Sequence, residues 1–120
     1  MTKQEALQKF FSGFGITAYP ISSVPEDTVF PWLTYDANIG NVGDGETSCT
    51  VNIWYHTESE AVPNAKVEEI SEKIGLGGIL LPYDDGAVWI KRGEPWCIPV
   101  VDDTDYSIKR RELNISLEFL

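Results

Sequence analysis

Apolar and polar side chains alternate from Arg111 to Leu120. Because successive side chains of a strand point to opposite faces, this alternation predicts a β-strand with a single apolar stripe. The stripe consists of Leu113, Ile115, Leu117 and Phe119. We therefore expect the chain to end in the core of its own fold, with no room there for a tail or an appended domain.

Two segments have apolar residues at the three- and four-residue spacing of an amphipathic helix. The first runs from Lys3 to Phe14, begins with a possible capping pair at Thr2 and Glu5, and ends at glycines. Its apolar side consists of Ala6, Leu7, Phe10, Phe11 and Phe14. The second runs from Ser59 to Ile74, with Val67, Ile70 and Ile74 on its buried side, and Gly75 ends it.

The remaining apolar segments have the composition of strands, and turn residues separate them. We expect strands at 16–19, 32–37, 46–57 and 79–83, with a hairpin turn at 84–86 that leads into a strand at 87–92. Gly93-Glu94-Pro95 predicts a break in that strand, followed by an irregular extended piece at 96–101 and a turn at 102–105.

This order of elements predicts an α+β fold for a single domain, residues 1–120. We expect a largely antiparallel sheet with both helices packed on one face. Trp54 lies opposite the apolar stripe of its strand, on the face that the helices would leave uncovered. A tryptophan at such a position indicates either that both faces of the sheet are covered or that it joins a subunit interface. Trp54 and the other apolar groups on this face favour oligomerisation.

Composition and charge exclude several classes of protein. The hydrophobic fraction of 42% is too high for a disordered chain, and no apolar run approaches the roughly 20 residues that span a bilayer. The N-terminus has no apolar segment behind a basic start, so we expect no signal peptide. The formal charge of −10 makes tight binding to nucleic acid improbable, although an acidic channel would let DNA slide through.

No pattern in the sequence predicts an active site, a cofactor or a metal centre. His56 is the only histidine, and we interpret it as a surface or boundary residue rather than a catalytic base. Cys49 and Cys97 have no metal-binding spacing and are interpreted as free thiols in a reducing compartment. Calcium at Asp84-Asp85 or at Asp102-Asp103 and Asp105 is a less favoured alternative to solvated turns.

Two further features are candidates for subunit contacts. The segment 38–45 has three glycines between two strand patterns, and it lacks the order of a phosphate-binding loop. We therefore predict a mobile hairpin loop that contacts neighbouring subunits. The basic run at 109–111 is expected to pair with an acidic patch, within the fold or across an interface. The candidate interface residues are Asn41, Val42, Asp44, Trp54, Lys109, Arg110 and Arg111.

The order of elements and several local sequences resemble a known family. The chain combines an N-terminal helix, the segment Phe30-Pro31-Trp32-Leu33-Thr34-Tyr35, the strand 51–55, a single helix, the hairpin end 90–93 and the closing strand 108–115. In this combination it resembles the small tail terminator, or tail-completion, proteins of long-tailed phages and prophages.

The resemblance implies a virion protein of the tail, assembled in the host cytoplasm, that forms a ring, with a hexamer as the expected size. The ring would cap the tail tube, stop its growth and contact a head-side connector protein, while DNA passes without specific binding. It implies no enzymatic activity, cofactor, metal or membrane. The alternatives are a head-completion or connector protein of the same virion, and a small non-viral enzyme or ligand-binding module.

Overall fold

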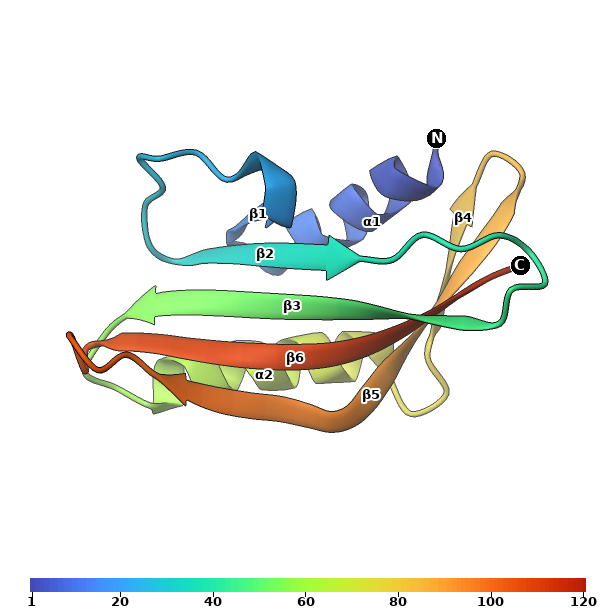
Figure 1. The fold of residues 1–120 in the computed structure, drawn as a ribbon. Helices are drawn as coiled ribbons and strands as arrows, with labels where there is room; N and C mark the ends of the chain where they lie inside the picture. The colour runs from blue at the N-terminus through green and yellow to red at the C-terminus, as the bar shows by residue number, and fades with distance from the viewer.

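A six-stranded sheet with two helices behind it forms the fold (Figure 1). The computed structural model describes all residues from Met1 to Leu120. The helices are α1 (Lys3–Phe11) and α2 (Ala61–Ile74), and the strands are β1 (Thr17–Pro20), β2 (Trp32–Ala37), β3 (Glu46–His56), β4 (Ile79–Tyr83), β5 (Gly86–Val101) and β6 (Ile108–Phe119). The spatial order is β1-β2-β3-β6-β5-β4.

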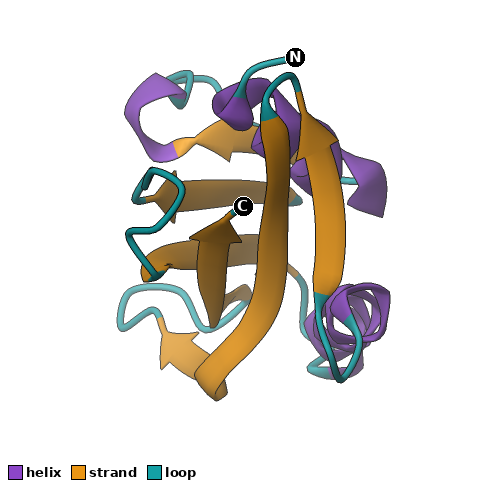
Figure 2. Ribbon diagram, turned by 90° about the vertical axis from the view of Figure 1, so that its right-hand side faces the viewer, coloured by secondary structure: helices purple, strands orange, loops and turns teal.

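The sheet is mostly antiparallel, as the sequence predicts. Only β1 and β2 run parallel; every other neighbouring pair is antiparallel. Both helices lie on the same side of the sheet, and the first part of β5 curls with β4 toward α1 (Figures 1 and 2). This arrangement confirms the predicted α+β fold.

Local sequence explains how the helices begin and end. The Thr2 hydroxyl accepts a hydrogen bond from the Glu5 backbone N–H, and the Glu5 carboxylate accepts one from the Thr2 N–H, so a capping box starts α1. The predicted helix to Phe14 is three residues too long, because Ser12–Phe14 form a 3₁₀ turn. Helix α2 ends at Gly75, whose φ of 77° is readily adopted only by glycine.

The core lies between the sheet and the two helices. It contains aromatic and aliphatic side chains from α1, α2 and all four long strands, and the completely or almost completely buried members include Leu7, Phe11, Leu33, Val51, Ile53, Ile70, Ile90, Leu113 and Leu117. Strand β6 supplies the predicted stripe, since its residues alternate between buried and half-buried positions. The side chain of Leu120 is 44% exposed, so Phe119 rather than the last residue completes the core stripe.

The break predicted at Gly93-Glu94-Pro95 is absent. Strand β5 continues through these residues to Val101. Its pairing with β6 shifts register between Arg92 and Cys97, so the extra residues of β5 form a bulge. A Cβ at position 93 would lie 2.9 Å from the Asn114 backbone oxygen, so glycine allows the close approach. The Asn114 side-chain amide donates to the Pro95 carbonyl at 2.7 Å and holds the irregular segment on the sheet.

Candidate interaction surface

An aromatic stack lies on the open face of the sheet, which we define as the face opposite α1 and α2. Trp32 and Trp54 are cross-strand partners on β2 and β3, and their rings stack with centroids 4.2 Å apart at 10°. Arg110 on β6 pairs with Trp54 across the sheet and lies over its ring at 5.9 Å. Phe30 extends this stack, with centroid distances of 6.5 Å to Trp32 and 5.6 Å to His56.

The stack remains accessible because no helix covers it. Trp32, Trp54 and Arg110 are each half-buried, and Phe30 is 37% exposed. A hollow of about 140 Å³ beside Trp54 is lined by Val100, Val101 and Asp102 at the end of β5 and by Ile108 and Arg110 of β6. Stacked tryptophans with an arginine are the composition most enriched at the energetic centres of protein interfaces.

Polar side chains without a partner in the chain lie next to the stack. Thr34 and Asn52 are opposite each other on β2 and β3, and neither the Thr34 Oγ1 nor the Asn52 Oδ1 makes a hydrogen bond. The same holds for the indole N–H of Trp32. Thr34 is 1% exposed and all three atoms are shut off from solvent, so a partner on the open face could reach them only after a local rearrangement.

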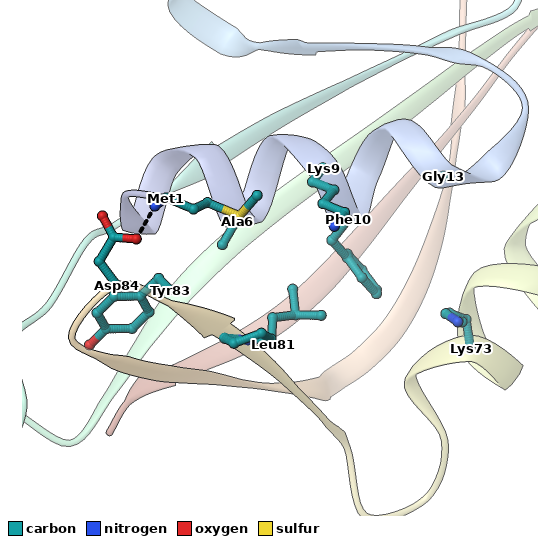
Figure 3. A pocket seen from close by; sticks show the side chains of 10 residues that line it. Met1, Ala6, Lys9, Phe10, Gly13, Lys73, Leu81, Tyr83 and Asp84 are labelled. Carbon is teal, nitrogen blue, oxygen red and sulfur yellow. Dashed lines mark hydrogen bonds and ion pairs between the residues drawn. The ribbon is translucent and has the colours of Figure 1, made fainter.

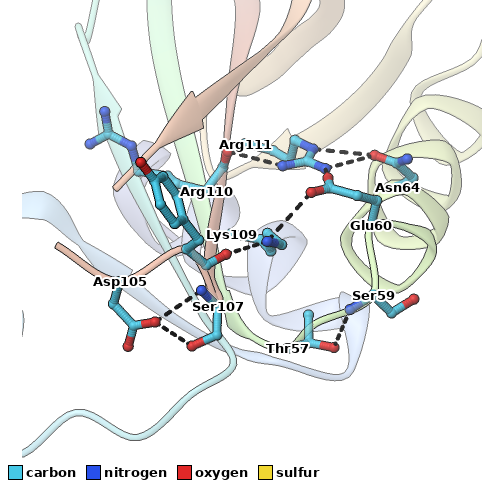
Figure 4. Close-up of polar contacts among 10 residues, drawn as sticks. Thr57, Ser59, Glu60, Asn64, Asp105, Ser107, Lys109, Arg110 and Arg111 are labelled. Carbon is cyan, nitrogen blue, oxygen red and sulfur yellow. Dashed lines mark hydrogen bonds and ion pairs between the residues drawn. The ribbon is translucent and has the colours of Figure 1, made fainter. Parts of the chain in front are cut away.

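The basic run 109–111 divides between the two faces of β6. Arg110 faces the open side, whereas Arg111 is only 5% exposed and donates to Glu60 at 2.5 Å and to Asn64 at 3.1 Å (Figure 4). Lys109 lies 3.5 Å from the same Glu60 carboxylate. The hydrogen bond from Arg111 and the charges of both cations lower the pKa of Glu60. Lys109 and Arg111 therefore tie β6 to the start of α2, and only Arg110 remains a strong contact candidate.

The glycine-rich loop between β2 and β3 is held by hydrogen bonds at both ends. The Asn41 N–H donates to the Asp44 carboxylate at 2.8 Å, and the Asp44 N–H donates to the Asn41 carbonyl at 3.0 Å. Lys3 from α1 donates to the Gly40 carbonyl at 2.8 Å. These hydrogen bonds constrain the loop more than the predicted mobile hairpin. Val42 at its tip is 65% exposed.

Trp54 and this loop lie at opposite ends of β3. The loop adjoins Glu46, and Trp54 follows eight residues later, which corresponds to about 26 Å at roughly 3.3 Å per residue. The loop and the stack consequently belong to two separate surfaces. Trp32 and Phe30 could not be predicted as members of the aromatic surface from local patterns, because cross-strand neighbours are known only once the register between strands is known.

The groups considered for catalysis or metal binding are engaged elsewhere or dispersed. Burial raises the pKa of the Cys49 thiol to about 12, which makes that thiol unreactive at neutral pH. His56 lies 3.7 Å from the exposed Asp105 carboxylate, and no group of three potential metal ligands occurs. The Asp102 carboxylate accepts hydrogen bonds from the turn that follows it, and Asp84 pairs with the N-terminal amino group.

Prolines occupy each free edge of the sheet. Pro20 lies on β1 and Pro82 on β4, while Pro95 and Pro99 lie on the part of β5 that extends beyond its pairing with β4. A proline has no N–H to donate, so these edges are poor templates for an added strand. Contacts with other proteins are therefore expected to use faces and loops.

No protein-family model matches the chain, and a search of curated proteins found no significant similarity. Neither helix has the length and apolar character that would be needed to cross a bilayer.

Proposed function

We propose that this chain is a tail terminator of a long-tailed phage or prophage, which caps the tail tube as a ring and forms part of the head-tail junction. The proposal begins with the sequence resemblance described above. The observation that carries it furthest is the open sheet face, where Trp32 and Trp54 stack at 4.2 Å under Arg110 without cover from the rest of the chain.

A partner that binds the open face would cost this chain little conformational entropy in ordering its aromatic side chains. The two indoles already fix each other, so binding a partner would not have to immobilise them. Since prolines blunt the sheet edges, a ring built from this face and the loops would not grow by strand addition.

The overall charge is compatible with a passage for DNA. The net charge of −10 repels phosphates, and a protein that surrounds moving DNA should not hold its backbone. The ring would then contact the tube protein on one side and a head-side connector on the other. A head-completion protein of the same virion would share the acidity and ring symmetry, so the decisive difference is the structure that the ring caps.

The test is a negative-stain image series of purified tail tubes and filled heads, each with and without this protein. We predict a ring at one end of the tubes and none on heads. Rings on heads alone would identify a head-completion protein, and rings on neither would contradict the proposed function. A Trp54→Ala protein that still melts cooperatively serves as the matched variant and is expected to leave tube ends bare.

A further inference from the structure

A cleft of about 600 Å³ lies between α1, β4 and the end of α2, away from the open face (Figure 3). Ala6 and Phe10 from α1 form one wall and Leu81 from β4 the other, so most of the lining is apolar. Met1 and Asp84 close one end through their ion pair. The volume suits a short segment of polypeptide or a drug-sized molecule.

Two unpaired cations border this cleft. Lys9 lies on α1 and Lys73 near the end of α2. Of the nine Lys and Arg residues, these are the only two whose side chains make no hydrogen bond, ion pair or cation–π contact. In a chain with a net charge of −10, two free ammonium groups beside one apolar cleft favour an occupant that is both anionic and apolar.

The loop between β1 and β2 has this chemistry. Glu26 and Asp27 are exposed and have no cationic partner, and Val29, two residues further on, is 77% exposed. The acidic turn at 102–105 is a poorer match, because the carboxylates of Asp102 and Asp105 already accept hydrogen bonds from their own turn.

We propose that the loop Val24–Phe30 of one copy occupies the α1–β4 cleft of the next copy, with Glu26 and Asp27 facing Lys9 and Lys73. Val29 would then replace water against Phe10 and Leu81. This inference rests on the proposed ring and identifies one of its subunit contacts.

The fold makes the contact head-to-tail. The loop lies at the end of the sheet where β2 and β6 begin. It leads into Trp32 at the start of β2, and the cross-strand partners of this tryptophan are Trp54 and then Arg110, near the start of β6. The cleft lies toward the other end, where β4 pairs with the part of β5 that is joined to the last residues of β6. In Figure 1 the loop and β4 are correspondingly at opposite ends of the sheet. A contact between two different surfaces repeats from copy to copy and closes into a ring when the rotation allows.

Carbodiimide cross-linking tests the contact directly, because it joins an amine to a carboxylate only when the two groups touch. Equal amounts of ¹⁴N- and ¹⁵N-labelled full-length protein would be mixed over a wide concentration range and again with tail tubes. We expect mixed-label peptides that join Lys9 or Lys73 to Glu26 or Asp27. Absence of these peptides under every condition, including at the highest concentration, would overturn the proposal.

Charge exchange separates this contact from general electrostatic effects. The variants K9E/K73E and E26K/D27K should each weaken the association of subunits by about tenfold or more. A tenfold change corresponds to about 1.4 kcal/mol, and like charges that face each other across a contact cost more than that. Sedimentation velocity and the yield of cross-linked peptides measure the association. The fourfold exchange variant should recover it. Glu68→Lys with Glu94→Lys is the matched control, and equal loss in that control would overturn the proposal.

The outcomes also separate this inference from the proposed function. Cross-links between Lys9 or Lys73 and the loop, without capped tubes, would retain the contact and reject the terminator function. Capped tubes with normal capping by K9E/K73E would retain the function and reject the contact. If decanoate bound the cleft while E26K/D27K assembled normally, the occupant would be a small amphipathic anion, and the proposal would be wrong.

Discussion

Trp54 is a candidate contact residue that lies outside the hydrophobic core. It is half-buried on the open face, and its main neighbours are Trp32 and Arg110. The hydrophobic core lies on the other face and does not include it. Its contribution to stability should therefore be that of a half-buried aromatic pair, which is about 0.5–1.5 kcal/mol beyond the effect of the buried area.

We predict that Trp54→Ala lowers the free energy of unfolding by less than about 2 kcal/mol, because it removes one stacked pair and leaves no core cavity. Urea unfolding of the variant measures this change. Phe11→Ala, in the core, is the comparison and should cost about 3–5 kcal/mol. A loss of 3–5 kcal/mol for Trp54→Ala would show that the tryptophan stabilises the fold like a core residue.

The alternation of side chains along a strand predicts which face a residue lies on, but not which residues of other elements contact it. It correctly separated Trp54 from the core stripe, because the period of two applies within one strand. It could not decide whether the cations at 109–111 pair within the fold, since Glu60 and Asn64 reach Arg111 only after α2 packs beside β6. Nor could it find the Trp32 stack, which depends on register between strands.

At the scale of elements, β6 organises the molecule. It lies between β3 and β5, pairs with both over most of its length, and carries four buried apolar side chains to the core. Phe119, near its end, contacts the Tyr83 ring edge-on at 6.3 Å and has Lys3 over its own ring at 5.1 Å. The end of β6 thus connects α1, β4 and the sheet.

We predict that Phe119→Ala destabilises the protein by about 3–5 kcal/mol, because its side chain is 1% exposed and truncation leaves a cavity. Leu120→Ala, one residue later and 44% exposed, should cost less than about 1 kcal/mol. Thermal and urea unfolding of both variants would check the contrast. Similar losses for the two would contradict the assignment of Phe119 as the last core residue.

Most elements were predictable because their side-chain periods are strong, and the misplaced boundaries have local causes. Strand β5 was predicted to break at Gly93-Glu94-Pro95, since these residue types usually interrupt strands. A register shift and the Asn114 amide keep that segment on β6, and such tertiary contacts leave no signal in a local pattern. The order of strands in the sheet likewise depends on contacts between distant segments.

The whole molecule has three candidate features for contact, which are the aromatic open face, the acidic loop at 24–30 that adjoins this face through Phe30, and the basic apolar cleft. The latter two lie toward opposite ends of a molecule whose extents are 43 × 30 × 22 Å. Prolines on the edges of the sheet disfavour open-ended growth by strand pairing. This distribution suits a subunit that repeats around an axis, and the proposed terminator function requires such a ring.

Tail termination is measured most directly by the elongation of tail tubes from preformed seeds in the presence of this protein. One ring closes one growing end, so elongation should stop at a concentration comparable to that of tube ends and far below that of free tube protein. Trp54→Ala should allow growth to continue. If tubes elongate at the same rate and to the same length with saturating wild-type protein, the chain does not terminate them, and this result would contradict the proposed function.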